Sequence, residues 1–155
     1  MALTWGGTKA AIGLFDENRR LRSERRYPSN PDLSAEDFFD ILLTEAQKLL
    51  DDELISRSRL RGIGLAMPSF ILFEKGHIIK TSNLVKIHDF PARSYISERF
   101  GGAPIILDND AHVAALAEHR MGAGRGFEHL IYCPVSTGIA SAMIINGKLF
   151  RGSYG

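Results

Sequence analysis

The pattern of apolar and polar positions near the start of the chain predicts a strand meander followed by a helix. Residues 10–15 form a compact apolar run, and residues 21–27 resume an extended pattern after a polar turn. Ser34 and Asp37 resemble a helix-capping pair, and apolar positions recur at helical spacing behind them. We therefore expect a helix over residues 34–50 whose apolar stripe packs on a sheet.

Beyond this helix, short apolar runs alternate with helical patterns. The predicted elements are strands at 61–67 and 104–107, a hairpin at 71–81, helices at 91–100 and 110–121, and a second meander at 130–135 and 139–145. Alternation of this kind implies an α/β fold with a layered, mixed sheet and right-handed crossovers. We expect the strands at Ile63 and Ile105 to run parallel to the first strand.

Composition adds that the chain holds enough apolar material for one ordinary core. It has 155 residues, of which 45% are hydrophobic and 24% charged, and its formal charge is +1. This balance favours neither a nucleic-acid surface nor a trap for acidic substrates. A local excess of arginines lies on a predicted strand with Glu24 among them, so a solvated strand face is favoured over a phosphate contact; these are Arg19, Arg20, Arg22, Arg25 and Arg26.

The cysteine count and the apolar runs indicate where the protein works. Cys133 is the single cysteine, which excludes an intrachain disulfide and a multi-cysteine zinc site in this chain. We expect this thiol, on a predicted strand, to pack in the core. No apolar run approaches the roughly 20 residues that span a bilayer, and no leader pattern precedes the first strand. A cytoplasmic protein without membrane contact is expected.

The glycine pair Gly6-Gly7, followed by Thr8, lies between two short apolar runs. Paired glycines let backbone N–H groups approach a phosphate closely, and a threonine adds a hydroxyl. The same residues also suit a hairpin whose turn simply needs glycine. Ser136-Thr137-Gly138 forms a second small-residue turn that resembles the first. The residues alone leave both interpretations open.

Asp108-Asn109-Asp110 stands where a predicted buried strand meets a helix, the usual place for ligand groups in open α/β sheets. A carboxylate there could accept a proton from a hydroxyl while the helix dipole stabilises its charge. A helix cap explains one of the three residues equally well. His112 and His119 are seven residues apart, too far for one metal ion, and His77 and His88 lie in loop-like sequence. Structural or solvent-facing histidines are expected.

Three stretches of the chain resemble, in order and spacing, the ROK family of sugar kinases and related repressors: GGTKAAIGLFD, LDNDAHVAALAEHRMGAGRG and VSTGIASAMIINGKLFRGSYG. GIGLAMPSF and TSNL match two lesser landmarks between them. The resemblance implies the actin-like ATPase, ribonuclease-H-like fold, in which two related α/β domains clamp ATP and a sugar. It also implies ATP-dependent phosphoryl transfer to a hexose hydroxyl.

The resemblance further implies roles for individual residues. Asp110 would be the general base, and Asn83, Asn109 and Asp110 would contact the hexose. The two small-residue turns would be phosphate loops for ATP with Mg²⁺; their candidate residues are Gly6, Gly7, Thr8, Lys9, Ser136, Thr137 and Gly138.

The sequence departs from the family pattern where phosphate and metal should bind. Thr4 replaces a family aspartate that holds Mg²⁺, and a neutral hydroxyl lacks the charge of a carboxylate. Ala140, Ser141 and Ala142 replace glycines of the second loop, and Ser69 replaces one after Pro68. These changes predict weakened binding of Mg²⁺ and ATP, with residual affinity directed to a sugar.

We expect residues 1–122 to form a ribonuclease-H-like domain and residues 123–155 a connector and the incomplete start of a second one. The family's Glu-x-Gly-His segment and cysteine-rich zinc loop are not in this sequence, so this chain is expected to hold no zinc and to be incomplete as a kinase. The alternative is a non-catalytic remnant that acts as a sugar-binding or protein-interaction module. Exposed apolar strands at residues 130–145 predict a homo-oligomer.

Overall fold

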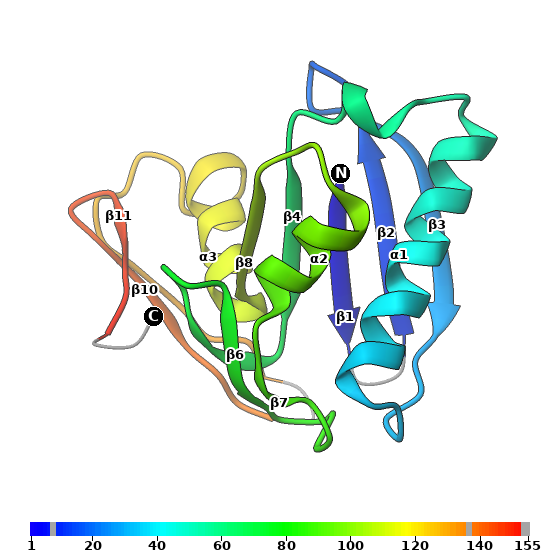
Figure 1. Cartoon of the computed structure of the whole chain (residues 1–155). Coiled ribbons are helices and arrows are strands. Elements are labelled where there is room, and N and C mark those ends of the chain that lie inside the picture. The colour runs from blue at the N-terminus through cyan, green and yellow to red at the C-terminus, as the bar shows by residue number, and fades with distance from the viewer. Residues whose placement is uncertain (7–8, 136–137, 153–155) are drawn as a thin grey trace.

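The computed structural model describes residues 1–6, 9–135 and 138–152, and these form three sheets and three α-helices (Figure 1). The largest sheet, sheet A, has the strand order β3-β2-β1-β4-β8. Its strands are β1 (Ala2–Gly6), β2 (Lys9–Phe15), β3 (Leu21–Pro28), β4 (Ile63–Met67) and β8 (Ile105–Asn109). β1, β2 and β3 pair antiparallel, whereas β4 runs parallel to both β1 and β8. The predicted mixed sheet is confirmed.

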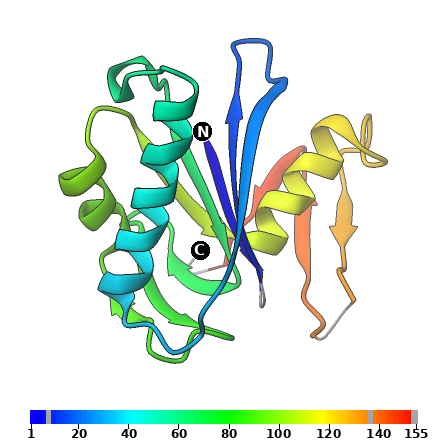
Figure 2. The ribbon, with the colours of Figure 1, turned by 90° about the vertical axis from the view of Figure 1, so that its right-hand side faces the viewer.

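Helices cover both faces of sheet A. Figure 2 shows α1 (Ala35–Asp52) and α2 (Ala92–Phe100) on one side and α3 (Asp110–Met121) on the other. The predicted cap of α1 is confirmed, because the Ser34 side chain accepts a hydrogen bond from the Asp37 N–H at 3.1 Å. The first core lies between sheet A and the α1–α2 layer, where Trp5, Phe39 and Leu65 are fully buried.

Sheet B is the predicted hairpin with one added strand. Its order is β5 (Ser69–Leu72), β6 (His77–Thr81) and β7 (His88–Phe90), and all neighbours are antiparallel. His77 and His88 were expected in loops, but each lies in a strand, and His77 Nε2 is 2.8 Å from the Asp89 carboxylate. A three-residue strand such as β7 is too short to show a two-residue period, so its pattern gives no strand signal.

Sheet C has the order β9 (Leu130–Tyr132), β10 (Ala142–Ile145) and β11 (Lys148–Phe150), and it packs on α3. β11 was not predicted as a separate strand. Asn146 and Gly147 both have positive φ, at 51° and 70°, which suits the tight turn between β10 and β11. The helix α3 contacts both sheet A and sheet C. The domain boundary proposed at residue 122 stays a prediction.

The expectations for Cys133 and for the arginine-rich strand have different outcomes. Cys133 was expected in the core on a strand, but it is exposed and lies beyond the end of β9. The arginines of β3 do form a solvated edge: Arg22 pairs with Glu53 at 2.6 Å and Arg25 with Glu45 at 3.3 Å. Arg19 and Arg20 were expected on the same strand, but they precede β3. Within the described residues, no helix is long and apolar enough to cross a membrane.

Candidate functional site

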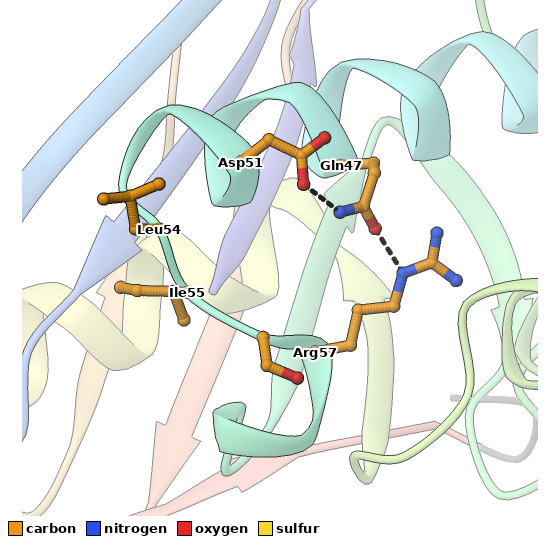
Figure 3. Close-up of a pocket in the computed structure, with 6 residues that line it drawn as sticks. Gln47, Asp51, Leu54, Ile55 and Arg57 are labelled. Atoms are coloured by element: carbon orange, nitrogen blue, oxygen red, sulfur yellow. Dashed lines mark hydrogen bonds between the residues drawn. The ribbon is translucent and has the colours of Figure 1, made fainter.

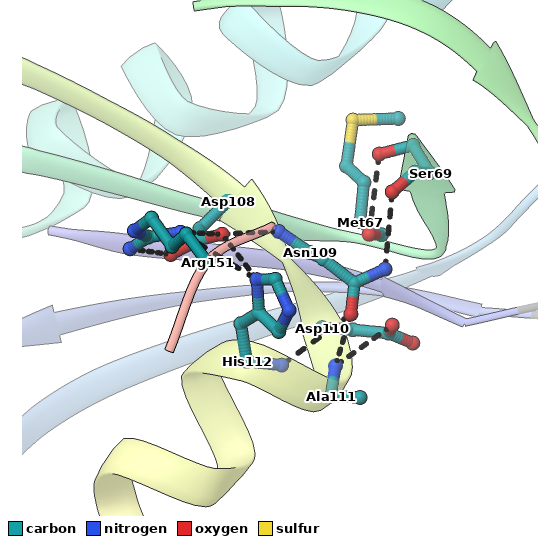
Figure 4. Close-up of polar contacts among 8 residues, drawn as sticks. All are labelled: Met67, Ser69, Asp108, Asn109, Asp110, Ala111, His112 and Arg151. Atoms are coloured by element: carbon teal, nitrogen blue, oxygen red, sulfur yellow. Dashed lines mark hydrogen bonds and ion pairs between the residues drawn. The ribbon is translucent and has the colours of Figure 1, made fainter. Parts of the chain in front are cut away.

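Asn109 ends β8 and caps α3, as one of the two interpretations of this motif requires (Figure 4). Its Oδ1 accepts the backbone N–H groups of Ala111 at 2.9 Å and His112 at 3.3 Å. Its Nδ2 donates one hydrogen bond to the Ser69 carbonyl at 3.0 Å. An amide nitrogen carries two hydrogens, so one donor of this half-buried side chain is left for a ligand.

Asp110 is the first residue of α3 and is only partly buried. Its Oδ1 accepts the Ala111 N–H at 2.9 Å, while Oδ2 has no hydrogen-bond partner among the described residues. The helix dipole stabilises negative charge at this N-terminus. A carboxylate with one satisfied and one available oxygen can accept a proton from a bound hydroxyl.

Asn83 lies in an exposed turn that shortly follows β6 of sheet B. The Thr81 hydroxyl donates to the Leu84 carbonyl at 2.5 Å and accepts the Leu84 N–H at 3.1 Å, which holds the turn closed. Thr81 pairs with Ser69, the residue whose carbonyl Asn109 contacts. Sheet B thus connects the turn that carries Asn83 to the Ser69 carbonyl that Asn109 contacts, and Asp110 directly follows Asn109 in the chain.

A buried ion pair behind Asn109 was missed by the sequence reasoning (Figure 4). Asp108 is 4% exposed, and its Oδ1 and Oδ2 accept from Arg151 Nη1 at 2.8 Å and Nη2 at 2.5 Å. Oδ1 also lies 3.1 Å from His112 Nδ1 and accepts the Asn109 N–H at 2.8 Å. Burial alone raises the pKa of Asp108, but the hydrogen bonds from His112 and Arg151, the Arg151 charge and the Asn109 N–H outweigh it and hold this pKa below its ordinary value.

One signal for this cluster was present in the sequence. Asp108 and His112 are four residues apart across a strand–helix junction, a spacing at which side chains can meet. Arg151 carries no such signal, because it is distant in the chain and reaches Asp108 only through the tertiary fold.

The predicted phosphate loops are described only in part. Gly7, Thr8, Ser136 and Thr137 lie outside the described residues, whereas Gly6 and Lys9 pair at the ends of β1 and β2. Gly138 is exposed in a bend, and a Cβ added there would meet no other atom within 4 Å. Ala142, which replaces a family glycine of the second loop, is buried in a cluster with Ala111 and Ala115 of α3.

A surface pocket lies at the end of sheet A opposite Asn109, and it is lined by the end of α1 and the segment between α1 and β4 (Figure 3). Its lining includes Asp51, Leu54 and Arg57, and Gln47 joins two of them by accepting from Arg57 and donating to Asp51. Asn109 stands at the carboxyl end of β8, so this pocket and the Asn109 site are at opposite ends of the parallel strands.

Comparison with known proteins gives one consistent relationship. The family model described as "ROK family" matches residues 1–155 of this chain. A Halalkalibacterium halodurans glucokinase is 30% identical over 154 residues, which cover 97% of this chain and 45% of that protein. A Caldicellulosiruptor bescii xylose repressor is 37% identical over 94 residues, which cover 61% of this chain and 23% of the repressor.

Among solved structures, a Streptomyces griseus ROK family glucokinase in complex with glucose and AMPPNP aligns with a TM-score of 0.83 at 27% identity. The alignment covers 99% of this chain and 46% of that enzyme. The chain therefore spans about half the length, or less, of the relatives that it matches.

Proposed function

The chain belongs to the ROK family, and we propose that it carries the sugar-binding half of an ATP-dependent kinase that phosphorylates a hexose hydroxyl. The observation that carries this proposal is the position of Asn109 and Asp110 at the carboxyl end of β8, hydrogen-bonded through Ser69 to the strand that leads to Asn83. The glucokinase relatives, one determined with glucose, support a hexose as the ligand.

In this proposal the described residues bind and activate a sugar hydroxyl. Asp110 Oδ2, which accepts no hydrogen bond among the described residues, takes the proton of the attacking hydroxyl. The second hydrogen of Asn109 Nδ2 and the exposed Asn83 amide orient neighbouring hydroxyls. A general base needs its proton donor within hydrogen-bond reach, and both amides serve to hold the sugar there.

The described residues around the phosphate loops do not fit Mg²⁺ with ATP. Thr4 is exposed on β1 and offers a neutral hydroxyl where a hard cation needs carboxylate charge. The buried carboxylate of Asp108 is already paired with Arg151. The proposal therefore assigns sugar binding and proton abstraction to this chain, and phosphoryl transfer to a complete two-domain enzyme.

A non-catalytic sugar-binding or protein-interaction module is the second candidate function. Thr4 favours it, and so does the similarity to a xylose repressor. The near-neutral charge of the chain argues against nucleic-acid contact by these residues themselves. A cytoplasmic location and a homo-oligomer belong to the proposal under both functions.

Calorimetric titration of the chain with glucose and, separately, with Mg-ATP tests the proposal. We expect glucose binding that falls at least about tenfold in Asp110→Ala and further in Asn109→Ala combined with Asp110→Ala, because each change removes polar contacts to the sugar. Asp51→Ala, which removes a carboxylate at the far pocket, is the matched control and should bind like the wild type. Tight Mg-ATP binding, or unchanged glucose binding in the double variant, would contradict the assignment.

A further inference from the structure

Asp108 needs its partner more than any other carboxylate in the described part of the chain, where it is the one buried charged residue. A buried charge that loses its partner is left uncompensated, which is far more costly than loss of a surface pair. Both carboxylate oxygens accept from Arg151, and the guanidinium fork matches this bidentate geometry. Arg151 therefore orients the Asp108 side chain, together with the contacts from His112 Nδ1 and the Asn109 N–H.

Arg151 reaches this position from the segment that follows β11, and it joins the three sheets at one point. Its guanidinium carbon lies 3.5 Å from the centroid of the Phe73 ring, in the turn between β5 and β6. Its two Nη atoms hold Asp108 on β8. Sheets C, B and A thus meet at a single side chain, whose stacking and ion pairing fix its plane.

The same carboxylate also fixes the backbone of the candidate site. Asp108 Oδ1 accepts the N–H of Asn109 at 2.8 Å, in addition to its bond from Arg151. The Asn109 side chain then caps α3 and contacts Ser69. A shift of the Asp108 carboxylate would therefore move the residue that precedes Asp110 and that ties α3 to sheet B.

We propose that Arg151 is a positioning residue for the sugar site: through Asp108 it holds Asn109 and Asp110 in the orientation that binds a hexose. The hexose in this inference rests on the proposed function, whereas the positioning rests on the contacts alone. A residue that merely joined the sheets would change the stability of the whole fold equally. A positioning residue changes the local order at residues 109–111 and the sugar affinity beyond any global effect.

Amide hydrogen exchange and glucose calorimetry on Arg151→Met and Arg151→Lys test the inference. In Arg151→Met we expect exchange at Asn109 and Ala111 to rise about tenfold relative to the amides of α1, and glucose affinity to fall about tenfold. Arg151→Lys should recover part of both, because it keeps the charge but not the bidentate fork.

Arg99→Met is the matched control, because Arg99 also stacks at 3.5 Å on an aromatic ring, Tyr95, and pairs with the exposed carboxylate of Asp40. It should leave both measurements at wild-type values. Unchanged exchange at Asn109 and Ala111 in a folded Arg151→Met protein overturns the inference. If that protein does not fold, Arg151→Gln decides by the same criteria. Absence of glucose binding by the wild type refutes the proposed function, while exchange still decides the positioning role.

Discussion

Sheets A and C are built from similar short apolar strands, yet they are covered to different extents. Sheet A has α1 and α2 on one face and α3 on the other, and its core residues are almost completely buried. Sheet C buries one face against α3, in a cluster built on Ala111, Ala115 and Ala142. Alternation along a strand predicts that one face is apolar, but it does not reveal whether the other face is covered as well.

The uncovered face of sheet C carries an apolar row across all three strands. Met143 pairs with Ile131 on one side and with Phe150 on the other, so the three side chains are cross-strand neighbours. Their exposed fractions are 38%, 66% and 50%, respectively. We expect a partner to cover a contiguous apolar row of this kind.

The largest expected effect is the difference in stability loss when a phenylalanine from each region is replaced by alanine. Phe39→Ala should lower the free energy of unfolding by about 3–5 kcal/mol, because the ring is fully buried and stacks on Phe90 at a centroid distance of 5.2 Å. Phe150→Ala, on the exposed face of sheet C, should change it by no more than about 0.5 kcal/mol. Urea denaturation measures both, and a comparable loss in the two variants would show that sheet C is as closely packed as sheet A.

The sequence predicted the helices and the long strands because their apolar positions recur over enough residues to define a period. It missed β7 and the separate strand β11, which have three residues each, although Asn146-Gly147 is a recognisable hairpin turn. The family resemblance and the strand–helix junction together singled out Asn109 and Asp110. The ion pair of Asp108 with Arg151 could not be predicted, because it depends on how sheet C docks against sheet A.

An intermediate effect is expected where the two regions are joined. Because its folded-state pKa is lowered, Asp108 contributes stability above the ordinary carboxyl pKa of about 3.9, and this contribution is lost as the pH falls through the lower folded value. Asp108→Asn should lower the free energy of unfolding at pH 7 by about 2 kcal/mol and flatten its fall on acidification. Urea denaturation at pH 7 and pH 3 measures this.

Asp51→Asn is the control for that experiment, because it changes an exposed carboxylate at the opposite end of sheet A. It should leave the stability at pH 7 within about 0.5 kcal/mol of the wild type. An Asp108→Asn protein with the same acid sensitivity as the wild type would mean that other carboxylates set the pH dependence.

The smallest effect on stability is expected at the apolar row itself, where self-association should change instead. We expect the wild-type chain to form at least a dimer through the exposed face of sheet C, because pairing two such faces removes apolar surface from water. Ile131→Lys places a charge in this row and should leave the free energy of unfolding of the chain within about 0.5 kcal/mol of the wild type, while shifting the protein to monomer.

Ile79→Lys is the matched control, because Ile79 is an exposed isoleucine on a strand of sheet B, and this variant should remain associated. Light scattering over a range of concentrations separates the outcomes. A monodisperse wild-type monomer at high concentration would rule out self-association, and an Ile131→Lys protein that stays dimeric would assign the contact to another surface of the molecule.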